Sequence, residues 1–133
     1  MRKVLFLFFI VALFGAANAQ NNLLGKSKSF ILSNTSEYSL QELTTDDGVK
    51  FLFSEVPDIG QLFLFFDGYD ICNTLALYPV NEEMLDALLE EIIKQGTKLT
   101  DKSWQIDTEA GSQHVSLEMD DNAKFYILFV PAK

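Results

Sequence analysis

The sequence predicts an α+β fold: a single antiparallel sheet of about five to seven strands with two helices packed on one face. Short stretches of alternating polar and apolar residues recur after residue 38, which is typical of strands. Turn-forming Asp, Gly and Pro residues separate these stretches at short intervals, so consecutive strands are expected to pair as antiparallel hairpins. One longer stretch, between Asn81 and Gly96, repeats apolar residues at helical spacing.

Two helices are expected, one before the strands and one between them. Ser27 is placed to cap a short helix that runs to about Asn34, with Phe30 and Ile31 facing inward. Asn81 is placed to cap the second helix, and Gly96 to end it. The second helix carries one apolar stripe, formed by Met84, Leu85, Leu88, Leu89, Ile92 and Ile93.

The strands are expected at 38–43, 49–56, 61–66, 70–78, 104–108, 113–119 and 124–130. In the second of these, Val49, Phe51 and Phe53 share one face, which is taken to point inward, and Lys50 and Ser54 share the other. The third strand is apolar on both faces, as expected of a strand in the middle of a sheet.

The first residues have the pattern of a cleavable signal peptide. A positive Met1-Arg2-Lys3 start is followed by an uncharged apolar run, and small residues at Ala17 and Ala19 suit cleavage before Gln20. The run is shorter than the ~20 residues that span a bilayer, so no stable membrane anchor is expected after cleavage. The predicted organisation is a signal peptide at 1–19 and one domain at 20–133, exported to the periplasm or secreted.

The charge of the chain narrows the classes of partner. Cleavage would remove Arg2 and Lys3 and no acidic residue, which leaves eight basic and nineteen acidic side chains, a net charge of −11 and no Arg. Nucleic-acid and phosphate binding depend on clusters of Lys and Arg, so neither is expected. A cationic partner is one hypothesis that the negative charge leaves open. The alternative is that the charge only keeps the protein soluble.

Few residues suggest catalysis. Cys72 and His114 could form a thiol–imidazole pair, which would make the protein a small thiol-dependent hydrolase. Cys72 falls inside an apolar strand, however, where a thiol usually acts as a small buried hydrophobe. One His and one Cys cannot build the usual zinc site, and no cofactor motif is present. The acidic turns at 67–70 and 120–122 could supply calcium ligands, although neither has the spacing of a calcium-binding loop.

The sequence therefore favours a non-enzymatic binding or protein-interaction module that acts through the sheet face opposite the helices. The residues expected to make contact are Tyr78, His114 and Tyr126. The partner is an unknown protein or small ligand, and a homodimer through the same face is left open. A third hypothesis is a carrier of a small apolar ligand, held between the long helix and the strands by Phe51, Phe53, Phe63, Phe65 and Leu88.

Two resemblances accompany this interpretation. The segment Gly25-Lys26-Ser27-Lys28-Ser29-Phe30-Ile31 and the Phe-rich hairpin with a lone Cys, Phe63 to Tyr78, resemble small secreted proteins of Bacteroidetes-type bacteria. More distantly, the chain is similar to the β-lactamase-inhibitor-protein-like modules of outer-membrane assembly lipoproteins. Those modules usually follow the first helix with Leu-Gly-x-Pro, where this chain has Leu32-Ser33-Asn34-Thr35 and no lipobox Cys. The departure puts the partner-docking role of those modules in question here, and the resemblance carries no catalytic residue across.

Overall fold

The computed structural model describes residues 23–34, 39–108 and 111–132. The predicted signal peptide, 1–19, lies outside these residues. The described elements, in chain order, are α2 (Lys28–Asn34), β1 (Gln41–Thr44), β2 (Lys50–Val56), β3 (Gly60–Phe66), β4 (Cys72–Pro79), α3 (Glu82–Gln95), β5 (Thr97–Thr100), β6 (Ser103–Thr108), β7 (Gly111–Met119) and β8 (Phe125–Pro131).

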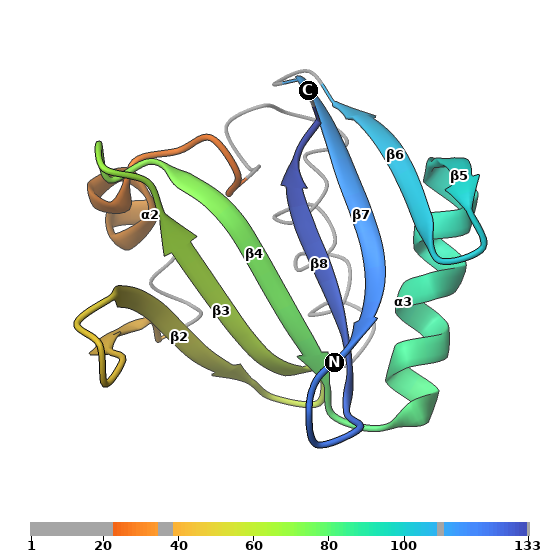
Figure 1. Cartoon of the computed structure of the whole chain (residues 1–133), viewed down its shortest axis with the longest axis horizontal. Coiled ribbons are helices and arrows are strands. Elements are labelled where there is room, and N and C mark those ends of the chain that lie inside the picture. The colour runs from red at the N-terminus through yellow and green to blue at the C-terminus, as the bar shows by residue number, and fades with distance from the viewer. Residues whose placement is uncertain (1–22, 35–38, 109–110, 133) are drawn as a thin grey trace.

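All eight strands belong to one antiparallel sheet with the order β1-β2-β3-β4-β8-β7-β6-β5 (Figure 1). Strands β1 to β4 form one meander and β5 to β8 form another. The two meanders join where β4 pairs with β8 through Leu75 and Phe129, Ala76 and Leu128, and Leu77 and Ile127. A helix followed by four strands thus occurs twice, although no repeat is visible in the sequence.

The predicted fold of about five to seven strands with two helices packed on one face is wrong. Among the described residues, the sheet has eight strands, and the helices have only seven and fourteen residues. They are too short to form a layer over so wide a sheet, and the fold is mostly sheet. None of the described helices combines the length and apolarity needed to cross a bilayer.

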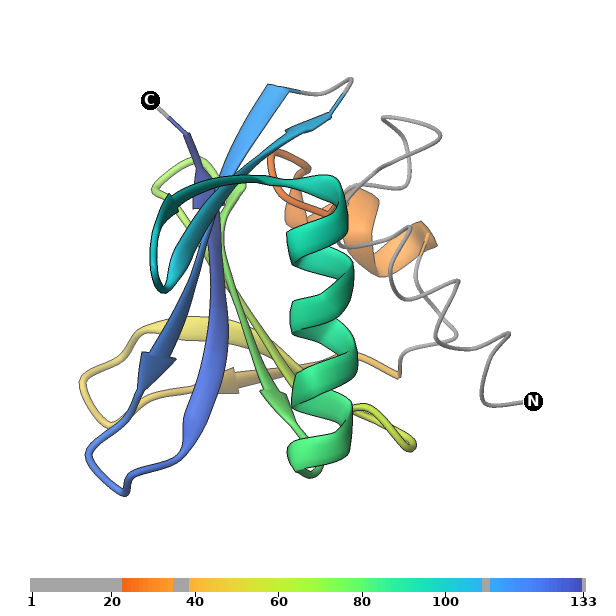
Figure 2. The same ribbon diagram turned by 90° about the vertical axis from the view of Figure 1, so that its right-hand side faces the viewer.

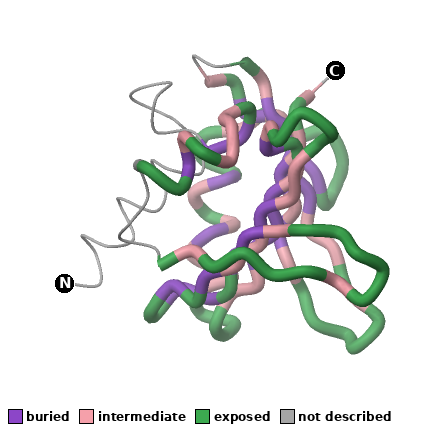
Figure 3. Tube along the Cα trace, turned by 90° about the vertical axis from the view of Figure 1, so that its left-hand side faces the viewer, coloured by how far each residue is buried: buried purple, intermediate pink, exposed green. Residues whose placement is uncertain are grey.

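The hydrophobic core lies along one side of the sheet. Ile31 from α2 and Leu88 and Ile92 from α3 join this cluster, and each is almost fully buried. Figure 3 shows the buried positions in the middle of the molecule and the exposed ones at the hairpin ends. Burying one such side chain contributes about 1.5–3 kcal/mol to folding. The strands supply the rest of the core, chiefly Leu52, Leu62, Leu64, Leu75, Leu77, Trp104, Ile106, Val115, Ile127 and Phe129.

The predicted caps of both helices are confirmed. The Ser27 hydroxyl oxygen accepts a hydrogen bond from the Phe30 amide at 3.2 Å. The Asn81 side chain accepts one from the Met84 amide at 2.8 Å, and α3 ends before Gly96. These bonds satisfy amides that a helix start leaves without a partner inside the helix.

The assignment of faces in β2 differs from the prediction. Leu52 pairs with Leu64 and Ser54 with Leu62, and these four side chains lie on the core side. Phe51 and Phe53 therefore point to the opposite side, because successive side chains of a strand alternate. The prediction was wrong because both sets of alternate positions in this strand contain large apolar residues.

Candidate binding surface

The side of the sheet opposite the core carries no helix among the described residues, and we call it the open face. Figure 2 shows α3 on the core side, with the strands between it and the open face. The strand registers and the alternation of side chains assign residues to this face. They are Gln41, Leu43, Phe51, Phe53, Glu55, Gln61, Phe63, Phe65, Thr74, Ala76, Tyr78, Thr97, Ser103, Gln105, Asp107, Ser112, His114, Ser116, Glu118, Tyr126, Leu128 and Val130.

Six aromatic rings lie next to one another on the open face. The Phe51 ring centroid lies 5.5 Å from that of Phe65 and 6.0 Å from that of Phe63. The Phe63 ring lies 5.1 Å from Phe53 and meets Tyr78 edge-on at 5.6 Å. Tyr78 in turn stacks on Tyr126 at 5.0 Å. We call Phe51, Phe53, Phe63, Phe65, Tyr78 and Tyr126 the aromatic cluster.

The aromatic cluster is both ordered and accessible. Every one of its six side chains is partly exposed. Aromatic pairs at these separations add about 0.5–1.5 kcal/mol each beyond the area that they bury. The rings therefore hold one another in place without a layer over them, and they present a contiguous apolar surface of the kind that often marks an interaction site.

The structure brings together two of the three residues predicted to make contact. Tyr78 and Tyr126 stack across β4 and β8. His114 lies on the same face in β7, but it pairs with Val130, four residues along β8 from Tyr126. At ~3.4 Å per residue this separation is roughly 14 Å, so His114 does not belong to the aromatic cluster.

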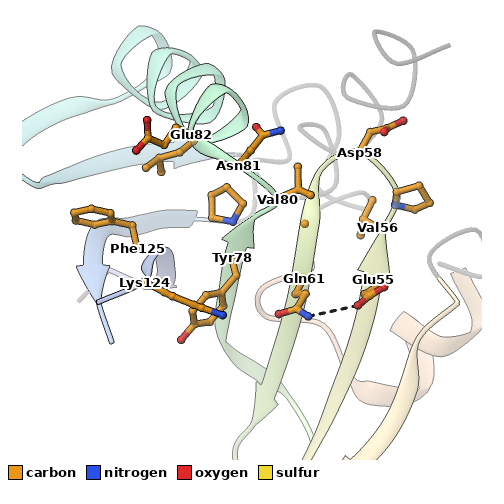
Figure 4. A pocket seen from close by; sticks show the side chains of 14 residues that line it. Glu55, Val56, Asp58, Gln61, Tyr78, Val80, Asn81, Glu82, Lys124 and Phe125 are labelled. Carbon is orange, nitrogen blue, oxygen red and sulfur yellow. Dashed lines mark hydrogen bonds between the residues drawn. The ribbon is translucent and has the colours of Figure 1, made fainter. Parts of the chain in front are cut away.

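A groove continues from the aromatic cluster around one end of the sheet. It has a volume of about 680 Å³ and lies where the β2–β3 turn, the start of α3 and the β7–β8 turn meet. Figure 4 shows Tyr78, Gln61 and Glu55 on three adjacent strands along it. The Gln61 amide donates a hydrogen bond to the Glu55 carboxylate at 3.4 Å. Tyr78 lines the groove and also belongs to the aromatic cluster, so the two are continuous.

The Tyr78 hydroxyl is fixed at this junction. Burial and a hydrogen bond to the Asp120 carboxylate raise the pKa of Tyr78 to about 12. The carboxylate of Asp120 also accepts backbone amides from Asn122 and Lys124, and these hydrogen bonds lower its pKa. The phenol is therefore a neutral donor at any ordinary pH, and its ring is held flat against Tyr126.

The sulfur of Cys72 is placed unfavourably for nucleophilic chemistry. The residue is fully buried in the core, and its thiol donates a weak hydrogen bond to the Thr74 carbonyl at 3.7 Å. Burial raises the pKa of the Cys72 thiol to about 12, whereas activated thiols have lowered values. His114 lies on the open face, so the sheet separates the two residues.

The residues proposed to hold an apolar ligand do not form a common site, and neither do those proposed to bind calcium. The four Phe residues lie on the open face, while Leu88 is buried on the core side. The carboxylates of Asp67 and Asp120 accept backbone amides of their own turns at 2.8–3.1 Å. Within the described residues, no group of three or more His, Cys, Asp or Glu side chains could hold a metal ion.

The prediction missed the four Phe residues of the aromatic cluster as surface residues. A signal for their placement exists in the sequence. Glu55 is in phase with Phe51 and Phe53, and Gln61 is in phase with Phe63 and Phe65. A charged or amide side chain at the end of an alternating series marks the solvent side, so these two residues indicate the face on which the rings lie.

Comparison of the chain with family models, curated proteins and solved structures gave no match.

Proposed function

We propose that this protein is an exported, non-enzymatic binding module that engages a partner through its open face. The observation that carries the proposal is the aromatic cluster: six mutually packed, partly exposed rings on the side of the sheet that no described helix covers. Aromatic side chains contribute a large share of binding energy at protein interfaces, and pre-ordered ones lose little entropy on binding.

The groove supports the same proposal. Its volume lies within the range of ligand pockets, and it adds polar groups at one end of an otherwise apolar surface. Interfaces typically combine an apolar centre with a polar rim. The aromatic cluster supplies such a centre, and Glu55, Gln61 and Lys124 supply part of such a rim.

Export is the part of the proposal that the first nineteen residues support. We expect the protein recovered from the periplasm or the medium of the producing cells to have an intact mass that begins at Gln20. A recovered chain that still begins at Met1, or one found only inside the cell, would contradict export.

Site-specific photo-crosslinking tests the use of the open face. A photoreactive phenylalanine analogue at position 53 lies in the aromatic cluster, while the same group at position 93 replaces Ile93, which is 60% exposed on α3. In the producing cells, we expect position 53 to form one discrete adduct and position 93 to form none. The adduct should disappear when Phe63→Ala is added, because Phe63 touches three other rings of the cluster.

Equal crosslinking from both positions would overturn the proposal, as would an adduct from position 93 alone. An adduct of twice the chain mass would identify the partner as a second copy of this chain, which is the homodimer left open by the sequence.

A further inference from the structure

The open face carries carboxylates but no cation on its strands. At the described strand positions of this face, Glu55, Asp107 and Glu118 are the charged residues, and none is Lys or Arg. The described strand lysines, Lys50 and Lys98, pair with Thr44 and Trp104 and lie on the core side of the sheet. On the described strands the aromatic surface is therefore bordered by carboxylates alone, while Lys124, in the β7–β8 turn beside Tyr78, brings one ammonium group to the adjoining groove.

Two of these carboxylates, those of Glu55 and Glu118, belong to one row of cross-strand neighbours that includes the stacked tyrosines. Glu55 pairs with Gln61, Gln61 with Tyr78, and Glu118 with Tyr126, while Tyr78 stacks on Tyr126. The five side chains thus form a row across β2, β3, β4, β8 and β7, with a carboxylate at each end. We call this the acidic row. It spans roughly 19 Å, from four strand spacings of ~4.8 Å, which is the length of about six extended residues.

The groove beside the acidic row has the same sign of charge. Its lining includes the carboxylates of Glu55, Asp58 and Glu82 and a single ammonium group, that of Lys124. Next to the row on its other side lie Phe53 and Phe63, which belong to the aromatic cluster. One edge of the row is thus acidic and the other is apolar.

We infer that the open face binds a basic, partly apolar polypeptide segment, whose Lys or Arg side chains lie along the acidic row and whose apolar side chains pack on the aromatic cluster. The inference rests on the proposed function and names the chemistry of its partner. Cations are attracted to the faces of Tyr and Phe rings as well as to carboxylates, and the acidic row offers both groups side by side. The net charge of the chain, −9, favours the encounter with such a segment.

Binding of model peptides tests the inference. The probes are three fluorescein-labelled dodecapeptides with alternating Lys and Leu, alternating Gln and Leu, and alternating Glu and Leu. Fluorescence anisotropy with the purified protein should show the order Lys-Leu, Gln-Leu, Glu-Leu from tightest to weakest. We expect the Lys-Leu affinity to fall with added salt, because exposed charges are screened.

Matched variants locate the effect on the acidic row. Glu55→Gln with Glu118→Gln should weaken Lys-Leu binding about fivefold, as expected for two partly exposed ion pairs, and should leave Gln-Leu binding unchanged. Glu83→Gln with Glu90→Gln removes the same charge from exposed positions of α3 outside the groove and the open face. This control should change Lys-Leu binding less than about twofold. Phe63→Ala should weaken both the Lys-Leu and the Gln-Leu peptides more than about tenfold.

Three outcomes would overturn the inference. The first is equal binding of the Lys-Leu and Gln-Leu peptides. If Phe63→Ala then abolishes the binding of both peptides, the open face binds apolar segments without a preference for positive charge. The proposed function would stand in that case. The second is an equal loss of Lys-Leu binding in the two charge variants, which would show attraction to net charge only. The third is no Lys-Leu binding at about 1 mM, a concentration that detects even weak complexes.

Discussion

At the scale of single residues, the β2–β3 turn depends on one glycine. Gly60 has a φ of 150° and pairs with Pro79. A Cβ at this position would overlap the backbone carbonyl oxygen of Tyr78, so β3 and β4 could not keep their separation. The glycine thus supports the strand that holds Tyr78 in the aromatic cluster.

We therefore predict that Gly60→Ala destabilises the protein by about 3 kcal/mol or more, because both the backbone conformation and the overlap are unfavourable. The midpoint of urea unfolding measures the change. Gly68→Ala is the control, since no atom lies within 4 Å of a Cβ there, and it should change stability by less than about 0.5 kcal/mol. A similar midpoint for both variants would show that β3 and β4 are not packed as described.

Cys72 gives a second prediction at this scale. Because the thiol is buried and its pKa is raised to about 12, we expect no reaction with an alkylating reagent in the native protein and complete reaction after denaturation. Mass spectrometry of the chain shows whether the Cys72 thiol carries the label. Rapid labelling of the native protein would restore the thiol-hydrolase hypothesis.

Tyr78 predicts a late step in the alkaline titration of the protein. Its pKa is raised from 10.0 to about 12, so the folded state binds its proton more tightly than the unfolded chain does. The stability that follows from this shift is present below pH 10 and is lost as the pH rises toward 12. Tyrosinate absorbance, recorded after a rapid pH jump, should show one tyrosine that ionises last, and Tyr78→Phe should remove that step. Late ionisation that persists in the variant would exclude Tyr78 as its source.

At the scale of elements, three hairpin turns share one construction. They are the turns 45–49, 67–71 and 120–124. In each, the backbone amide of the first residue donates a hydrogen bond to the backbone carbonyl of the fifth. The backbone carbonyl of the first residue accepts a hydrogen bond from the backbone amide of the fourth. The first residue's side-chain oxygen also accepts the fifth residue's amide. In each turn the fourth residue, Gly48, Asp70 or Ala123, has a positive φ. These are three-residue hairpin loops whose last residue is left-handed.

Ala123 is the least suitable residue for that fourth position. Its φ of 61° is unfavourable for a residue with a Cβ, whereas Gly48 occupies the equivalent position at a φ of 90°. We predict that Ala123→Gly stabilises the protein by about 0.5–1 kcal/mol, and that Gly48→Ala destabilises it by a similar amount. Thermal unfolding measures both variants. A loss of stability in Ala123→Gly would contradict the assigned turn.

Most elements could be predicted from the sequence, because hairpin turns and helix caps are local signals. Seven of the eight described strands agree with the sequence-based prediction within a few residues of their observed bounds. The exception, β5, is a four-residue edge strand whose positions are all exposed, so no apolar alternation reveals it. The faces of β2 and β3 could not be assigned from periodicity, since Phe51 and Phe53 alternate with Leu52, and Phe63 and Phe65 with Leu62 and Leu64.

At the scale of the whole molecule, the strand order decides where the candidate site lies. The pairing of β4 with β8 joins residues about fifty positions apart in the chain, and no local signal specifies it. That pairing stacks Tyr78 on Tyr126 and completes the aromatic cluster. The sequence could thus nominate both tyrosines as contact residues, but it could not show that four Phe residues lie beside them or that His114 does not.

The two halves of the sheet differ in chemistry despite their similar construction. On the open face, β2 and β3 present four Phe rings, whereas β6 and β7 present Gln105, Asp107, His114 and Glu118. In the proposed complex, the apolar half would supply contact area and the other half polar groups, so the partner would meet the two in a single orientation. The seam at Tyr78 and Tyr126 is where the two chemistries meet.

The central claim is that the aromatic cluster faces solvent, and NMR with a soluble paramagnetic probe tests it most directly. We predict strong broadening of the ring protons of Phe53 and Phe63 and little broadening of those of Phe129, which is 1% exposed in the core. Protection of Phe53 and Phe63 equal to that of Phe129 would show that the rings belong to the core. In that case the aromatic cluster would not be exposed to solvent, and it could not bind a partner.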